Sequence, residues 1–291
     1  MGCYHMENKR STKDLALSSN ERLYLKNKHN FLFKIKKAKN FKSKYLDFYT
    51  FHVGFKKKLD DLLIVVFKEL TPLSAVYSKT STPSAPIIWD KMNNKGLCKL
   101  LIINAGNANA HTGKNGIKTI DKYVSAALKY FNCKKSQVLV SSTGVIGEKL
   151  NANKIIKVFP TILKSKTKNL LSASKAIMTT DTYPKIIVKK IKINSKIIKI
   201  FGFAKGSGMI FPNMGTMLSY IFIEANLSKG ILKKILHSNL DSSFNSISVD
   251  GDTSTSDTLM LFSLSDRDQK KIKSLNIINK ISLGLKEVMS A

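Results

Sequence analysis

Arginine is scarce in this 291-residue chain, although the chain is strongly basic. Its 49 Lys and Arg residues face 19 acidic residues, and the only arginines are Arg10, Arg22 and Arg267. Surfaces that bind nucleic acid usually use arginine for bidentate contacts to phosphates and bases. Lysine is instead spread along nearly the whole sequence. The formal net charge of +30 therefore indicates an overall bias in composition more than a dedicated nucleic-acid surface.

Cysteine is also rare, and long apolar runs are missing. Cys3, Cys98 and Cys133 are odd in number and contain no Cys-x-x-Cys spacing, which argues against a disulfide framework or a structural zinc site. The five histidines include no His-Glu-x-x-His motif, so no metal is expected. The longest apolar run, residues 62–67, is too short to cross a bilayer, and the N-terminus lacks signal-peptide order. These absences predict a cytoplasmic protein without a membrane partner.

The hydrophobic pattern mixes strand and helix signals. Asn194-Ser195 joins two alternating segments and predicts a β-hairpin. Ser228 precedes an apolar helical stripe and predicts a helix cap. We expect strands at 62–67, 99–104, 137–141, 186–193, 196–203 and 216–223, and helices at 117–131, 153–176 with a break at Pro160, after 228, and at 269–290. The mixture favours the α+β class, with large sheets covered by helices.

Residues 1–45 differ in composition from the remainder of the chain. Lysines alternate loosely with aromatic residues between Phe31 and Tyr45. One interpretation is a basic arm whose aromatic side chains stack on single-stranded nucleic acid. The alternative, which we favour because no later segment supports nucleic-acid binding, is a poorly ordered or edge-strand extension.

Three stretches next to predicted strands are rich in Gly, Asn, Ser and Thr, namely 104–113, 141–147 and 204–216. Small residues allow the backbone to approach a ligand and to present N–H groups to it, although each stretch alone is also typical of a tight turn. Neither a P-loop nor a Gly-x-Gly-x-x-Gly fingerprint has the required spacing. Gly-x-Ser-x-Gly and cysteine-protease signatures are absent as well.

The step Gly215-Thr216 has a chemical use that the other candidates lack. A threonine hydroxyl that attacks the preceding carbonyl forms an ester, and water then releases a new N-terminus. The freed α-amino group has a reference pKa of ~7.7–8.0 and can accept the proton of its own hydroxyl. A small residue before the threonine, here Gly215, permits the strained turn that this reaction needs.

The segment around Thr216 resembles the signature of the ornithine acetyltransferase (glutamate N-acetyltransferase) family of arginine biosynthesis. The resemblance covers roughly residues 49–290. It is carried by segments in the family's order: Ala75-Val76-Tyr77 through Ser84-Ala85-Pro86, GNANAHTG at 106–113, SSTGVIG at 141–147, Ala176 to Asp181, Lys205 to Leu218, and Ser243 to Thr255. Such a set in order makes agreement by chance implausible.

The resemblance implies specific roles for several residues. Thr216 would be the acetyl acceptor and, with Gly215, the self-cleavage site. Thr143 and Gly144 would form the oxyanion hole. Substrate would be bound by Thr179 (or its neighbour Thr180), Lys205 and Thr216.

The resemblance also implies a fold, a reaction and an assembly. The fold would be a layered α/β/β/α sandwich of the self-processing, N-terminal-threonine nucleophile type. The enzyme would move acetyl from N-acetylornithine to glutamate by a ping-pong mechanism, with no cofactor beyond acetyl-CoA as an alternative donor. Residues 46–215 would form an α chain and 216–291 a β chain after the N-terminal extension 1–45. The two chains would assemble as a heterotetramer that binds neither nucleic acid nor membrane.

The sequence departs from the family pattern at two places that matter. Gly215 replaces a usual Ala before the nucleophile, which should alter the rate of cleavage. Family members continue past the point that matches Ala291 with further substrate ligands, so we expect this chain to be C-terminally truncated. Two other functions remain open: a self-processing amidohydrolase or aminopeptidase that uses water as acceptor, and a basic nucleic-acid-binding protein acting through residues 25–45.

Overall fold

The structure, a computed structural model, describes residues 38–162, 164–206, 217–246 and 254–291. Its strands are β1 (Leu46–Phe51), β2 (Leu62–Tyr77), β3 (Leu97–Asn107), β4 (Val138–Val145), β5 (Lys185–Ile193), β6 (Lys196–Lys205), β7 (Leu218–Ile223) and β8 (Thr258–Ser263). Its helices are α2 (Ala85–Asn93), α3 (Gly113–Ala127), α4 (Ala152–Ile156), α5 (Phe159–Ile162), α6 (Leu170–Ile177), α7 (Lys229–Leu240) and α8 (Leu275–Met289), with short 3-10 turns at Lys135–Gln137 and Phe244–Ser246. The prediction of the α+β class is confirmed.

The strands follow one path, β4-β3-β2-β8-β7-β6-β5, with β1 paired to β2. The long strand β2 belongs to both halves of this path: residues near its start pair with β1 and β3, and residues near its end pair with β8. The register shifts between Val66 and Thr71, where the two halves meet. Most neighbours are antiparallel, and the exceptions among the described strands are β3 with β4 and β7 with β8.

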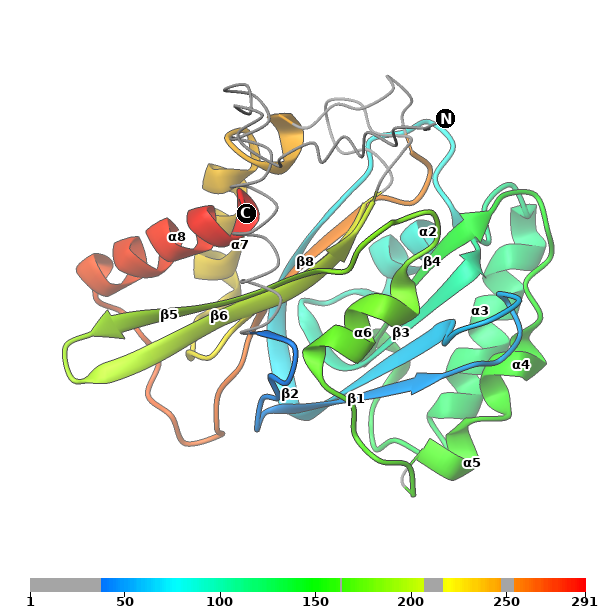
Figure 1. Cartoon of the computed structure of the whole chain (residues 1–291), viewed down its shortest axis with the longest axis horizontal. Coiled ribbons are helices and arrows are strands. Elements are labelled where there is room, and N and C mark those ends of the chain that lie inside the picture. The colour runs from blue at the N-terminus through cyan, green and yellow to red at the C-terminus, as the bar shows by residue number, and fades with distance from the viewer. Residues whose placement is uncertain (1–37, 163, 207–216, 247–253) are drawn as a thin grey trace, which may run out of the picture.

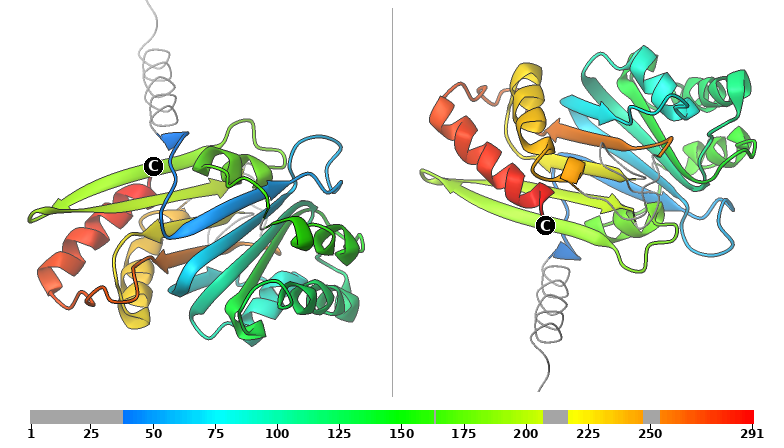
Figure 2. Two further views of the ribbon diagram at one scale, coloured as in Figure 1. Left: turned by 90° about the horizontal axis from the view of Figure 1, so that it is seen from below. Right: turned by 90° about the horizontal axis from the view of Figure 1, so that it is seen from above.

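Successive side chains of the strands point to opposite faces of the sheet and pack into three buried cores. The cores lie between four layers of helices and strands (Figures 1 and 2). Leu63, Val65 and Phe67 of β2 point toward the other half of the sheet, where Phe67 meets Phe262 with ring centroids 4.9 Å apart. Leu62 and Ile64 point the opposite way, into a core closed by α2, α3, α4 and α5. A third core lies under α7 and α8 on the outer face of β6, β7 and β8. The arrangement is helices, sheet, sheet, helices.

Most predicted elements are present, with shifted ends. The hairpin turns at Asn194, whose φ of 55° suits the left-handed conformation that Asn tolerates. The Ser228 hydroxyl accepts a hydrogen bond from the Ile231 N–H, as an N-cap should. The predicted helical segment 153–176 consists of three short helices, α4, α5 and α6, and the interruption predicted at Pro160 is present, since Pro160 lies in the first turn of α5. The last helix begins after Ser274, because its N-cap Ser274 is extended and the Ile272 N–H donates to the Asn226 carbonyl instead of to a helical one.

Residues 38–45, the end of the predicted extension, contact the sandwich. Ala38 is buried, and the Phe41 ring lies 4.6 Å from that of Phe201. The Ser43 hydroxyl donates to Glu224 at 2.9 Å. Residues 1–37, which carry most of the predicted basic arm, lie outside the described part of the chain.

Candidate active site

The last residues of strand β4 include Thr143 and Gly144, which lie beside the end of β3. Gly106 and Gly144 pair in the parallel register, with φ of +109° and +127°. A Cβ on Gly106 would lie 2.5 Å from the Phe55 carbonyl oxygen, and one on Gly144 would lie 2.6 Å from the Asn107 nitrogen. Both positions therefore require glycine, because backbone packs directly on backbone there. Thr143 is held next to this contact and is 1% exposed.

Lys205 brings together three of the predicted site residues. It is the last residue of β6, pairs with Leu218 of β7 and is 3% exposed. Its ammonium Nζ donates to Thr143 Oγ1 at 2.9 Å and to Thr179 Oγ1 at 3.0 Å. Burial lowers the pKa of Lys205, and the charge of Asp181 opposes that shift. The result is a buried cation whose hydroxyl partners come from β4 and from the segment after α6.

Asp181 organises the segment on either side of this lysine, and no role for it followed from the sequence. Its Oδ1 accepts hydrogen bonds from Lys185 Nζ and from the Gly206 N–H, both at 2.8 Å, and its Oδ2 accepts one from the Thr179 N–H at 3.3 Å. Burial would raise the pKa of Asp181, but the Lys185 bond and the Gly206 N–H outweigh it and lower the pKa below its usual value. Asp181 therefore stays ionised and fixes the residues that flank Lys205.

The loop between β1 and β2 connects the paired glycines Gly106 and Gly144 to the segment that carries Thr179. Buried Asp61 accepts hydrogen bonds from the backbone N–H groups of Phe55 (2.6 Å) and Lys56 (2.9 Å). Lys56 Nζ donates to the carbonyls of Ala176 and Met178, each at 3.2 Å. The carbonyl of Phe55 is the group that leaves no room for a side chain at Gly106. One loop thus braces both parts of the candidate site.

Gly215 and Thr216 lie outside the described residues, and the next residue, Met217, is described. The Met217 N–H donates to Asp257 Oδ1 at 2.8 Å. Asp257 is 0% exposed, and its Oδ2 is an acceptor with no hydrogen-bond partner within the described ranges. Burial raises the pKa of Asp257 to about 7, although the Met217 N–H, the Ser254 hydroxyl and the charge of Lys205 act in the opposite direction.

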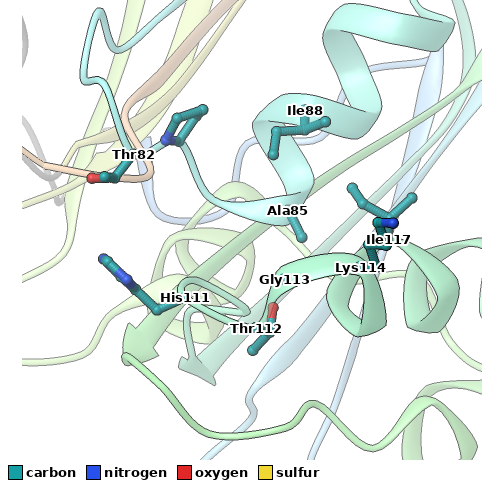
Figure 3. Close-up of a pocket in the computed structure, with 9 residues that line it drawn as sticks. Thr82, Ala85, Ile88, His111, Thr112, Gly113, Lys114 and Ile117 are labelled. Carbon is teal, nitrogen blue, oxygen red and sulfur yellow. The ribbon is translucent and has the colours of Figure 1, made fainter.

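A separate cavity of about 480 Å³ lies between α2 and the start of α3. Its walls include Ile88, His111 and Lys114, and Figure 3 shows these side chains around the opening. None of its described lining residues is one of the predicted site residues. The GNANAHTG segment thus contributes Gly106 to the contact with Gly144 and His111 to this cavity.

Neither a metal cluster nor a membrane span is found in the part of the chain that the structure describes. No group of three or more His, Cys, Asp or Glu side chains there could hold a metal ion. No helix in the same residues is long and apolar enough to cross a bilayer.

Comparison with known proteins gives consistent matches. The model of the ArgJ family matches residues 47–290. The arginine biosynthesis bifunctional protein ArgJ of Bartonella henselae is 42% identical over 208 residues, which is 71% of this chain and 51% of the relative. The protein of the same name from Gluconobacter oxydans is 39% identical over 233 residues, 79% of this chain and 55% of the relative. This chain therefore spans about half the length of the curated relatives that it matches.

Solved structures agree on the fold. The crystal structure of the arginine biosynthesis bifunctional protein ArgJ from Bacillus halodurans matches with a TM-score of 0.54 and 30% identity, covering 60% of this chain and 92% of that one. The structure of ornithine acetyltransferase from Mycobacterium tuberculosis, complexed with ornithine, matches with a TM-score of 0.50 and 24% identity over 60% of this chain and 93% of that one.

Proposed function

This chain belongs to the ArgJ family, and from that premise we propose that it is a self-cleaving acetyltransferase that uses Thr216 as its nucleophile. The proposed reaction is acetyl transfer from N-acetylornithine to glutamate in arginine biosynthesis. The names of its relatives support the pathway, and the ornithine in the Mycobacterium tuberculosis structure supports an amino-acid substrate of that class.

The observation that carries the proposal is the contact of Lys205 with Thr143 and Thr179. These residues are far apart in sequence, yet one buried ammonium binds both hydroxyls. A hydroxyl that accepts a hydrogen bond from an ammonium has its own O–H proton free to donate. Thr143 can aim that proton at an oxyanion, together with the N–H of Gly144, the next residue of β4. A positive charge beside this pair further stabilises negative charge on the reacting oxygen.

The chemistry proceeds in two stages at one hydroxyl. In maturation, Thr216 Oγ1 attacks the carbonyl carbon of Gly215, the C–N bond breaks as the amide nitrogen takes a proton, and water hydrolyses the resulting ester. In turnover, Oγ1 attacks the acetyl carbonyl of N-acetylornithine and passes its proton to the Thr216 α-amine. Ornithine then leaves with that proton. Glutamate attacks acetyl-Thr216 through its amino group and regenerates the hydroxyl. Thr143 and Gly144 stabilise the oxyanions of the tetrahedral intermediates in both stages.

The proposed partners follow from the same premise. They are the two small-molecule substrates and the α and β chains produced by cleavage, which would remain associated as a heterotetramer. Acetyl-CoA would be an alternative acetyl donor, and no other cofactor is required. Self-cleavage and acetyl exchange are separate activities of the proposed enzyme. The two activities are therefore tested separately.

The nucleic-acid alternative receives no support from the described part of the basic arm. Lys42 Nζ donates to the Thr167 carbonyl at 3.2 Å, and Lys44 forms an ion pair with Asp266 at 2.8 Å. These cations are engaged with the body of the fold.

The test is the mass of the purified chain under denaturing conditions, followed by acetyl exchange between N-acetylornithine and glutamate. We expect two fragments, the smaller one starting at Thr216, and none in a Thr216→Ala variant. An uncut wild-type chain would refute the maturation step. Cut protein that releases acetate with water, and does not acetylate glutamate, would identify a hydrolase instead.

A further inference from the structure

Asp257 is a buried acid for which the proposed mechanism has no use. It lies directly before β8, at the point where the ends of β2, β7 and β8 meet. Tyr77 at the end of β2 pairs with Thr258, and the Met217 N–H donates to the carboxylate oxygen Oδ1 of Asp257. The nitrogen of Met217 is covalently bonded to the carbonyl carbon of Thr216. A carboxylate therefore binds the peptide group that leads out of the nucleophilic residue.

The same residue is anchored on its other side. The Ser78 N–H donates to the Asp257 carbonyl at 3.0 Å, and the Ser78 hydroxyl donates to the Ser254 carbonyl at 2.7 Å. The Thr258 N–H donates to the Met217 carbonyl at 2.9 Å. Ser78 directly follows β2, so its hydrogen bond fixes the backbone of Asp257 to the end of that strand. The carboxylate of Asp257 in turn holds the N–H of Met217 in place.

We propose that Asp257 is the positioning residue of the nucleophile, holding the Thr216–Met217 peptide group in the orientation that self-cleavage and acetyl transfer both require. This inference rests on the proposed function of Thr216. It adds a requirement for a residue that has no substrate contact of its own. It also assigns a purpose to a carboxyl group whose burial would otherwise only cost stability.

The charge state of Asp257 matters because an ionised acceptor binds an N–H more strongly than a neutral one. Its pKa of about 7 means that the carboxyl group changes between its neutral and its ionised form near neutral pH. Lys205 of β6 is the charged group whose field acts on Asp257. Tyr77 of β2 and Tyr220 of β7 have pKa values raised by burial, so both stay neutral. Maturation isolates the effect of Asp257, because the α-amine of Thr216 does not exist before cleavage.

The test compares the full-length wild-type chain with Asp257→Asn, Asp257→Ala and the control Asp90→Asn. Asp90 is also fully buried and also accepts one backbone N–H, that of Val140 at 3.0 Å, but it lies in α2, and its other partner is the Tyr77 hydroxyl at 3.4 Å rather than Met217. We expect Asp257→Ala to slow self-cleavage at least 100-fold and Asp257→Asn about tenfold. The rate in Asp257→Asn should lose its rise near pH 7. Asp90→Asn should stay within about twofold of wild type.

A second readout needs no catalysis. In protein labelled with ¹⁵N-methionine, with Met217 assigned by a Met217→Leu variant, the Met217 amide should titrate with a midpoint near pH 7, and this titration should vanish in Asp257→Asn. A titrating amide in a chain that never cleaves would refute the function of Thr216 and leave the Asp257 contact standing. Cleavage without any titration, or folded Asp257 variants that cleave at the wild-type rate, would overturn the positioning role.

Discussion

Lys205 Nζ donates a 2.9 Å hydrogen bond to Thr143 Oγ1, and this contact joins the two halves of the sandwich. Lys205 ends β6, whereas Thr143 lies near the end of β4, at the opposite end of the strand path. Because the bond is buried, removing either partner leaves the other buried group with one hydrogen bond fewer. The contact is therefore both a structural tie and the basis of the proposed oxyanion hole.

Replacing Thr143 with Val tests the hydrogen bond between Lys205 and Thr143 directly. Valine keeps the shape and removes the hydroxyl, so self-cleavage and acetyl transfer should fall by about 10²–10³-fold. The free energy of unfolding should fall by ~1–3 kcal/mol, because Lys205 loses a buried partner. Thr71→Val is the matched control, since Thr71 is similarly buried but donates to the nearby Glu69 carbonyl. A folded Thr143→Val protein with wild-type rates would remove Thr143 from the mechanism.

Asp181→Asn should weaken the segment around Lys205. It removes the charge that pairs with Lys185, and the free energy of unfolding at pH 7 should fall by ~1–3 kcal/mol. The pKa of Asp181 is lowered by folding, so its contribution is complete above its unfolded pKa of ~3.9 and is lost as the pH falls through the folded value.

Denaturant unfolding at pH 7 and pH 3 measures this difference, which should shrink at the lower pH. Asp266→Asn serves as the control, because the Asp266–Lys44 pair is largely exposed and its loss should leave the midpoint unchanged. Equal losses for both variants would contradict a special role for Asp181.

Gly144 and Gly147 form a matched pair for testing whether the contact between Gly144 and Gly106 requires glycine. Both have positive φ, but a Cβ on Gly144 would strike the backbone of Gly106 and Asn107, whereas one on Gly147 would meet no atom within 4 Å. Gly144→Ala should therefore cost ~3 kcal/mol or more, and Gly147→Ala only ~1–2 kcal/mol of backbone strain. Thermal melting of the two variants checks the order, and equal melting temperatures would show that the crowding is relieved by small shifts.

Asp257→Asn should change how stability depends on pH. Folding raises the pKa of Asp257 from ~3.9 to about 7, so the folded state prefers the protonated acid. Wild-type stability should fall relative to the variant as pH rises from ~4, with the loss complete above pH ~7. The rise from ~3.9 to about 7 corresponds to ~4 kcal/mol at 1.36 kcal/mol per unit. Urea unfolding at pH 5 and pH 8 measures it, and a constant difference between the two proteins would contradict a raised pKa.

Local signals predicted the elements whose causes are local. The turn at Asn194 and the cap at Ser228 depend on neighbouring residues, and both are found where the sequence places them. The second half of β2 was missed because Lys68, Glu69 and Pro72 interrupt its alternation. That half is a strand because its partner β8, remote in sequence, lies beside it.

The candidate site divides in the same way. Thr143, Thr179 and Lys205 were identified through a family resemblance, and the fold brings their side chains within hydrogen-bonding distance. Asp181 and Asp257 received no role, because their importance comes from burial and from N–H groups contributed by other segments. No spacing in the sequence indicates such partners, since a single acidic residue is locally typical of an ordinary surface position.

The position of β8 also sets the order in which a growing chain can assemble. In the strand path β8 separates β7 from β2, so the strand that follows Thr216 joins the half-sheet of Thr143 only after residues 258–263 have been made. Pairings between segments so far apart in sequence form late in folding, because closing the intervening loop costs entropy first. Asp257 arrives with the same segment. A ribosome-bound chain that ends before β8 would therefore carry the proposed scissile bond without the frame around it, and unfinished protein would be protected from premature cutting.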